Sequence, residues 1–304
     1  ILSGLVGSEM CIRDRVGNGS MQILELVCKT FINEGERVIS GHPSFRVFNG
    51  LVRAAGGYWE GVPLRDHVHD LDAMRAAIRP DTKIVIVCNP NNPTGTVVEP
   101  QALRDFAASF PADRVLILDE AYAEYCEPGT LPDFRELMDL CPNLLVLRSF
   151  SKAYGLAGLR CGYAIGSTAI INMLERARMP FVANSLALVG AEAALGDVDF
   201  LERSRANNKA GLARMVEGLT AMGLGYLPSS TNFLAVHVGE NDLPYFEGML
   251  SEGVIVFPGT NTDYRGWVRV TVGTPPQVER FLEATARVFE RSRAEIEGAV
   301  AAHG

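Results

Sequence analysis

Three apolar runs of the sequence each end in polar residues whose side chains can do chemistry. Residues 89–95, 119–122 and 149–152 follow these runs, and they include an asparagine, an aspartate, a tyrosine and a lysine. Each is ordinary when it stands alone, because Asn/Pro/Gly clusters form turns and an acidic residue after a strand often caps a helix. Ligands of open α/β sheets, however, bind beyond the carboxyl ends of the strands. Amine, carboxylate and phenol groups gathered there predict a site for nucleophilic and acid–base chemistry.

The elements that must position these residues alternate along the first two thirds of the chain. Short or continuous apolar runs predict strands, several of them covered on both faces, at residues 37–40, 83–88, 114–119 and 144–149. Helical spacing and helix-end signals predict helices at residues 21–31, 45–55 and 100–109. A further strand at 162–165 is expected to run opposite to the others or at an edge. Strands separated by helices indicate an α/β fold, in which a mainly parallel sheet has helices on both faces.

The pattern changes after about residue 196. One long helix is predicted first, then three strands and a closing helix, over residues 200–222, 232–236, 254–257, 267–272 and 275–289. About a hundred residues of this kind suffice for a second domain. We therefore expect a large domain over residues 16–196 and a small α+β domain over residues 197–304.

Residues 1–15 do not fit either domain. They read ILSGLVGSEMCIRDR and lack the basic start and the cleavage site of a signal peptide. They resemble translated sequencing-adapter read-through. We expect a non-native leader here, with native sequence from about Val16, in the middle of a longer gene.

The composition is that of an ordinary globular protein. The 304 residues are 47% hydrophobic, and 28 basic against 36 acidic residues give a net charge of 28 − 36 = −8. Apolar content of this size excludes a disordered chain. The acidic balance offers no electrostatic footprint for nucleic acid or an anionic membrane, and no apolar run is long enough to span a bilayer.

The cysteines and histidines predict neither disulfides nor a metal site. The six cysteines include no Cys-x-x-Cys pair, which favours a reducing, cytoplasmic compartment. His67 and His69 can share one face of a strand, but no third ligand stands near them. We expect no bound metal.

The order of the three polar segments resembles that of a known family. Asn-Pro-Asn-Asn-Pro-Thr-Gly precedes Asp-Glu-Ala-Tyr, and Ser-Phe-Ser-Lys-Ala-Tyr-Gly-Leu-Ala-Gly-Leu-Arg follows. This order is similar to that of fold-type-I pyridoxal-phosphate (PLP) aminotransferases of classes I and II, most of all the histidinol-phosphate branch. The resemblance extends from Val16 to about Arg291. It implies an aspartate aminotransferase-like fold with a seven-stranded type of sheet, PLP as cofactor, and a homodimer with shared active sites.

The resemblance implies roles for the catalytic residues. Lys152 matches the lysine that forms a Schiff base with the cofactor and later carries a proton. Asp119 matches the carboxylate that keeps the ring nitrogen protonated, so that the ring remains an electron sink; a helix cap is its alternative role. Tyr122 and Asn92 resemble the two residues that bind the ring hydroxyl oxygen.

Further residues match the family's phosphate and ring contacts. The phosphate-binding set implied by the resemblance comprises Gly19, Ser20, Met21, Ser149, Ser151 and Arg160. A planar guanidinium and a helix N-terminus both suit a phosphate. Relatives usually carry an acidic residue where Met21 stands, so only a backbone contact is expected there. Phe45 matches the aromatic residue that stacks on the ring, with a core phenylalanine as the alternative.

The substrate side shows one match and two departures. Arg269 matches the arginine that binds the substrate carboxylate, and Asn232 has a supporting role near the mouth of the site. Many relatives have an arginine in a Val-Arg-Pro segment, where this chain has Phe257, and a phenylalanine favours an apolar or aromatic substrate group. The family's N-terminal segment, with a tyrosine that reaches the partner subunit's cofactor phosphate, is absent, so we expect a truncated chain.

The resemblance implies transfer of an amino group between histidinol phosphate or an aromatic L-amino acid and a 2-oxo acid such as 2-oxoglutarate. Three alternatives stay open. One is a PLP-dependent decarboxylase of a phospho-amino acid of the threonine-phosphate type. Another is a non-catalytic aminotransferase-like domain of a PLP-sensing regulator, and the third is an inactive fragment.

Overall fold

The computed structural model describes residues 14–180 and 182–303, with side chains as far as Arg291. The chain forms two compact units. The first ends at Arg205 and leaves out Pro93–Gly95, and the second consists of these three residues and the chain from Ala206 onward. The division lies inside a long helix, α9 (Val198–Ala221), rather than at residue 196. Residues 1–13 of the expected leader lie outside the described part.

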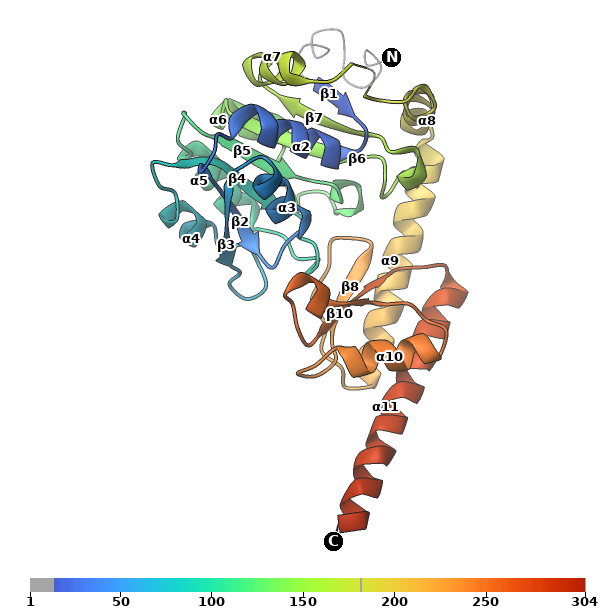
Figure 1. Cartoon of the computed structure of the whole chain (residues 1–304). Coiled ribbons are helices and arrows are strands. Elements are labelled where there is room, and N and C mark those ends of the chain that lie inside the picture. Colours follow the sequence, from blue (N-terminus) through green and yellow to red (C-terminus); the bar gives the residue numbers. More distant parts are fainter. Residues whose placement is uncertain (1–13, 181, 304) are drawn as a thin grey trace. The chain divides into compact units, whose positions relative to one another are not determined.

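A seven-stranded sheet forms the centre of the first unit (Figure 1). Its strands are β1 (Asp14–Gly17), β2 (Arg37–His42), β3 (Tyr58–Pro63), β4 (Thr82–Cys88), β5 (Val115–Asp119), β6 (Leu144–Ser149) and β7 (Gly162–Gly166). They lie in the order β1-β7-β6-β5-β4-β2-β3. β7 is antiparallel to both of its neighbours, and β2 to β6 are mutually parallel. The mainly parallel sheet of the expected fold class is therefore confirmed.

Two strands of this sheet were not predicted. β3 is an edge strand whose first residue, Tyr58, is 55% exposed, so it lacks the continuous apolar run of a central strand. β1 includes Asp14 and Arg15, which were expected to belong to a non-native leader. Their backbones pair with Ile165 and Ala164. β7 therefore lies between two strands, β1 and β6, and not at an edge of the sheet.

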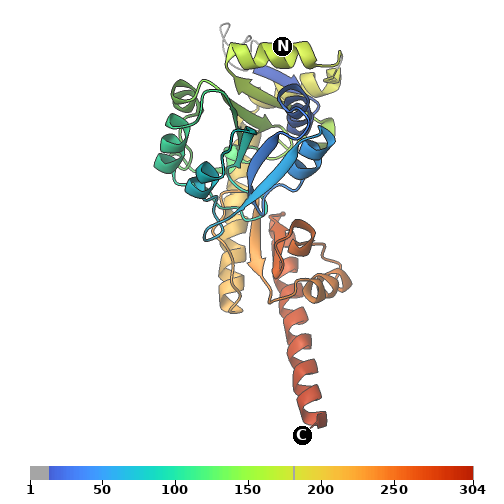
Figure 2. The ribbon, with the colours of Figure 1, turned by 60° about the vertical axis from the view of Figure 1, so that its left-hand side comes forward.

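Helices cover both faces of this sheet (Figure 2). One face packs against α2 (Ser20–Phe31), α3 (Val47–Ala54) and α7 (Thr168–Ala177), and the other against α4 (Leu71–Ala76), α5 (Pro100–Ala108) and α6 (Phe134–Leu140). Successive strand residues point to opposite faces. Thus Ile117 belongs to the first core, and Leu116 and Leu118 to the second. A further helix, α8 (Ser185–Gly196), precedes α9.

The second unit is an α+β unit. Its antiparallel sheet has the order β8-β10-β9, with strands β8 (Phe233–His237), β9 (Phe257–Pro258) and β10 (Trp267–Thr271). The core residues of this sheet pack against α9, α10 (Leu243–Ser251) and α11 (Pro275–His303). β9 is shorter than the predicted strand over 254–257, because Ile255 is 83% exposed and does not join the core.

Cysteines and helices of the described part bear on earlier expectations. Cys28, Cys88, Cys141 and Cys161 are buried free thiols, Cys126 is buried as well, and Cys11 lies outside the described residues. Within residues 14–180 and 182–303, no group of three His, Cys, Asp or Glu side chains can hold a metal ion. None of the helices described there is both long and apolar enough to cross a membrane.

Candidate active site

The carboxyl ends of β4, β5 and β6 meet at one cavity of the first unit, as the strand order requires. The cavity has a volume of about 200 Å³. It is lined by ten of the predicted residues, Ser20, Met21, Phe45, Asn92, Asp119, Tyr122, Ser149, Ser151, Lys152 and Arg160. Residues up to 140 positions apart in sequence (160 − 20) are therefore brought together by the sheet and by the start of α2.

Lys152 and Asp119 supply an amine and a carboxyl group to this cavity. The Lys152 ammonium nitrogen lies 5.0 Å from the centre of the Tyr122 ring. Asp119, the last residue of β5, is 4% exposed, and its Oδ1 accepts a hydrogen bond of 3.2 Å from the Ala121 backbone N–H. Burial raises the pKa of Asp119 to about 6, although this hydrogen bond and Lys152 pull it down. A cationic N–H group in the cavity would stabilise the carboxylate form.

Arg160 stands at the centre of an anion-binding corner. It has a left-handed backbone (φ 58°), and its Nη1 donates hydrogen bonds to the Ser151 hydroxyl at 3.3 Å and the Ala157 carbonyl at 3.1 Å. The Ser149 hydroxyl oxygen accepts a 3.1 Å hydrogen bond from the Ser151 backbone N–H. This geometry brings a guanidinium and two hydroxyl groups to the cavity wall, a donor set that suits a phosphate.

The N-terminus of α2 completes this corner. Its cap residue, Gly19, has φ 79° and makes no side-chain capping hydrogen bond, so the first N–H groups of the helix can serve an anion. A Cβ atom at Gly19 would lie 2.4 Å from Arg160 Nη2. Gly19 does not line the cavity itself, but only a glycine lets Arg160 approach the helix this closely. Met21 is 40% exposed and has no acidic group to offer.

Two loops carry Phe45 and Asn92, and hydrogen bonds through Asn91 join them. The Ser44 hydroxyl donates to Asn91 Oδ1 at 2.7 Å, and Asn91 Nδ2 donates to the Pro43 carbonyl at 3.2 Å. The half-buried Phe45 ring meets the Phe48 ring edge-on at 5.5 Å. This bracing explains why a turn rich in Asn and Pro can hold side chains at a fixed position.

Three lining residues were not predicted as part of the site: Cys88, Ala121 and Ala157. Burial raises the pKa of the Cys88 thiol well above its usual range, so the thiol is a neutral wall and not a nucleophile. Its position at the end of β4 is the signal that could have identified it. The two alanines leave room for a ligand and carry no chemical signal.

Arg269 and Asn232 belong to the second unit. The Arg269 guanidinium carbon lies 4.8 Å from the centre of the Phe257 ring and 5.1 Å from that of Phe233. Phe257 is its cross-strand neighbour on β9, and Phe233 lies on β8, opposite Thr271. Two aromatic rings thus lie within cation–π range of this guanidinium. The Asn232 carbonyl accepts a 2.9 Å hydrogen bond from the Val272 N–H.

Comparison with known proteins gives consistent similarities. The family model described as aminotransferase class I and II matches residues 15–284. Histidinol-phosphate aminotransferase 2 of Pseudomonas fluorescens (strain Pf0-1) is 44% identical over 276 residues, which cover 91% of this chain and 75% of that protein. Histidinol-phosphate aminotransferase of Halalkalibacterium halodurans is 40% identical over 273 residues, 90% of this chain and 74% of that protein.

Solved structures of aminotransferases are also similar to this chain. The crystal structure of histidinol-phosphate aminotransferase from Sinorhizobium meliloti in complex with pyridoxal-5'-phosphate has a TM-score of 0.88 and 28% identity, and covers 95% of this chain and 79% of that chain. Aspartate aminotransferase from Thermus thermophilus with maleate has a TM-score of 0.83 and 27% identity, covering 91% and 76%.

Proposed function

The chain belongs to the class I and II aminotransferases and is a PLP-dependent transaminase, and on this premise we propose that it exchanges an amino group between histidinol phosphate and 2-oxoglutarate. Aromatic L-amino acids are the second class of donor in this proposal. The observation that carries it is the convergence of Lys152, Asp119 and Arg160 on one cavity. The choice of histidinol phosphate is supported by relatives that are 44% identical and are histidinol-phosphate aminotransferases.

The residues present fit PLP. In this proposal Ser149, Ser151, Arg160 and the start of α2 hold the phosphate, because they form a corner of hydrogen-bond donors beside a positive charge. Asp119 would hold the ring nitrogen, whose positive charge would offset the burial that raises the pKa of this carboxyl group. When bound, PLP supplies an electron sink for negative charge at the substrate Cα.

The remaining lining residues orient the ring and move the proton. Tyr122 and Asn92 would donate hydrogen bonds to the ring hydroxyl oxygen, and Phe45 would pack against the ring. The Lys152 amine would hold the cofactor through its aldehyde group. When free, the same amine would be the base for the proton at the substrate Cα. Its position over the Tyr122 ring supports this assignment, because the ring limits where the amine can move.

Arg269 binds the anionic group of the substrate, with Asn232 in support. The rings of Phe233 and Phe257 lie within cation–π range of the guanidinium, and a carboxylate or phosphate at its N–H edge would form two parallel hydrogen bonds. Phe257 also places an apolar ring beside this charge. That ring is the basis for including aromatic L-amino acids among the donors.

The assembly that we propose is a homodimer with shared active sites, in a reducing cytoplasm. On α8, Leu186 is 73% exposed and Val189 61% exposed, and neighbouring apolar side chains on a helix surface are typical of an interaction surface. The free cysteines named above support the reducing compartment.

Half-reaction spectroscopy tests this function. Glutamate added to the PLP-loaded full chain should shift the visible absorbance of the lysine-bound cofactor to that of its aminated form, and a 2-oxo acid should reverse the shift. Histidinol phosphate should act faster than phenylalanine or tyrosine as a donor. Absence of any shift with all four donors would contradict transamination, and release of carbon dioxide from threonine phosphate would favour decarboxylation instead.

A further inference from the structure

A buried cluster of three charges, Glu120, Arg148 and Glu124, lies next to the candidate active site without lining it. The side chains of Glu120 and Glu124 are 0% and 8% exposed, and that of Arg148 is 20% exposed. Arg148 Nε donates a 2.7 Å hydrogen bond to Glu120 Oε2, and its Nη2 forms an ion pair with the same oxygen. Arg148 Nη1 lies 3.4 Å from Glu124 Oε1. One guanidinium thus joins two carboxyl groups.

This cluster occupies the face of the sheet opposite to the cofactor corner. Leu118 and Val146 belong to the core under α4, α5 and α6, and strand alternation places Glu120 and Arg148 on that same face. The Phe134 ring of α6 confirms this placement, since its centre lies 5.9 Å from the Arg148 guanidinium carbon. Asp119 and Ser149 therefore point to the other face, where the cavity is.

Each member of the cluster is a close sequence neighbour of a cavity residue. Glu120 follows Asp119, and its N–H donates a 2.9 Å hydrogen bond to the Leu147 carbonyl, which extends the β5–β6 ladder by one residue. Arg148 precedes Ser149 directly. Glu124 lies in the short 3-10 helix Ala123–Tyr125, which follows Tyr122. The ion pairs consequently hold the ends of β5 and β6 and the loop after β5 in one arrangement.

Stability alone is a poor explanation for this cluster. Buried ion pairs gain little over apolar residues of the same shape unless further hydrogen bonds satisfy their remaining lone pairs. Among the residues that the structure describes, Glu120 Oε1 and Glu124 Oε2 have no hydrogen-bond partner. Burial raises the pKa of Glu120 to about 7, although Arg148 pulls it down, and burial raises that of Glu124 as well. The three charges are costly to bury, and what they provide is a defined geometry.

We propose that Arg148 is a positioning residue for the cofactor: through Glu120 and Glu124 it fixes Asp119, Tyr122 and Ser149 relative to one another. A carboxylate for the ring nitrogen and a hydroxyl for the phosphate must meet one rigid molecule at the same time. A small shift between β5 and β6 would leave one of the two contacts unmade. This inference rests on the proposed function, because it concerns how tightly the site holds PLP.

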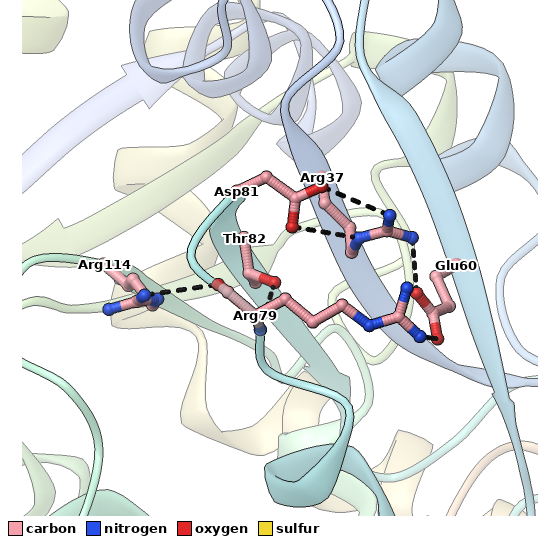
Figure 3. A network of polar contacts seen from close by, with 6 residues as sticks. All are labelled: Arg37, Glu60, Arg79, Asp81, Thr82 and Arg114. Atoms are coloured by element: carbon pink, nitrogen blue, oxygen red, sulfur yellow. Dashed lines mark hydrogen bonds and ion pairs between the residues drawn. The ribbon is translucent and has the colours of Figure 1, made fainter.

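The chain contains a matched control at the other edge of the same sheet. Arg37, at the start of β2, also joins two acidic residues, since its side chain pairs with Glu60 and Asp81 (Figure 3). The Arg37 side chain is 13% exposed, close to the 20% of Arg148. None of these three residues lines the cavity. Loss of Arg37 should therefore affect folding and leave cofactor binding intact.

The experiment compares PLP binding and thermal unfolding in the full chain. Arg148→Met should lower the unfolding midpoint and raise the PLP dissociation constant at least tenfold. A change of this size corresponds to the loss of roughly one charge-assisted contact. The triple variant Glu120→Gln/Glu124→Gln/Arg148→Met removes all three charges, so its midpoint should recover while its PLP affinity stays weak. Arg37→Met should lower the midpoint only. The pH dependence of the bound cofactor's visible absorbance should change in the Arg148 variants and not in Arg37→Met.

The outcomes separate this inference from the proposed function. If the triple variant binds PLP as tightly as the wild type, the cluster is only structural and the inference is wrong. Glu120→Gln, which keeps the side-chain shape, provides a second test should the triple variant not fold, and unchanged PLP affinity in it overturns the inference too. Wild-type protein that does not bind PLP would refute the proposed function and the inference together.

Discussion

Both the amino and the carboxyl edge of the seven-stranded sheet carry charged residues, and those at the carboxyl edge line the candidate site. At the amino edge, Arg37 and Arg79 meet the carboxylates of Glu60 and Asp81, and the Arg114 side chain bonds the Arg79 carbonyl (Figure 3). The charges of Arg37, Arg79, Glu60 and Asp81 are thus paired within the protein. At the carboxyl edge, Asp119 and its neighbours instead line a cavity.

The difference shows what distinguishes a functional cluster from a structural one. Arg37 has opposite charges within hydrogen-bond reach, and its guanidinium also covers the Tyr58 ring at 4.6 Å. Asp119 has a raised pKa because burial outweighs its contacts with Ala121 and Lys152. Charges that are paired within the protein stabilise the fold. A buried ionisable group with a shifted pKa beside a cavity is instead typical of a ligand-binding or catalytic site.

Lys152→Ala is the substitution at the carboxyl edge with the largest expected effect. Loss of the amine that anchors the cofactor and carries the proton should lower the transamination rate by about 10⁴-fold or more. The visible absorbance of the lysine-bound cofactor should disappear while thermal unfolding stays nearly unchanged. Lys83→Ala is the control at the amino edge, where the Lys83 amine lies 3.3 Å from Glu36. Retained colour in Lys152→Ala would show that another group binds the cofactor.

Asp119→Asn should separate function from stability. The amide cannot hold a proton on the ring nitrogen, so transamination should fall by about 10²-fold or more. Without cofactor, the variant should be more stable than the wild type above pH 6. Burial raises the pKa of Asp119 from 3.8 to about 6, so wild-type stability falls as the pH rises through this range.

The expected gain in the cofactor-free Asp119→Asn protein follows from that shift. It corresponds to about 2–3 kcal/mol at pH 8, and should vanish at about pH 3 and below, where the carboxyl group is mostly protonated in the folded and unfolded states alike. Urea unfolding of both proteins at about pH 3 and about pH 8 measures it. Equal stability at pH 8 would mean that Asp119 already has a sufficient partner inside the protein.

Arg160→Lys keeps the charge of the phosphate corner and removes its planar fork. PLP affinity should fall by about tenfold, because a lysine cannot form two parallel hydrogen bonds to a phosphate. Equilibrium titration with PLP provides the measurement, and Arg79→Lys at the amino edge should bind PLP like the wild type. If both variants bound PLP equally well, Arg160 would be another structural arginine and the contrast between the edges would weaken.

The carboxyl edge could be predicted from sequence largely because its strands are buried on both faces. Continuous apolar runs marked β4, β5 and β6, and the residues that follow such runs must meet at one edge. β3 lacks this signal, since only one of its six residues is buried. The short helices α4 and α6 have too few turns to show a period, so they were missed.

The buried acids were missed for a different physical reason. Glu120 and Arg148 are charged residues at strand ends, and charged residues are seldom fully buried, so the sequence suggests a solvated face. Only the register between β5 and β6 brings them together under α6. The Arg37 network is similar, because its members come from the starts of different strands, 44 positions apart for Arg37 and Asp81.

The smallest expected effect is at Glu60, which bridges Arg37 and Arg79 at the amino edge. Glu60→Gln should lower the unfolding midpoint by a few degrees and leave PLP affinity and transamination unchanged. The side chain is 23% exposed, so salt should screen its ion pairs, and the difference from the wild type should shrink in 1 M salt. The effect of Arg148→Met should persist in salt, because that pair is buried on its acidic side. Thermal unfolding of both variants at two salt concentrations compares the edges directly. Equal salt sensitivity would contradict the distinction between a network with partly exposed carboxylates and a cluster with buried ones.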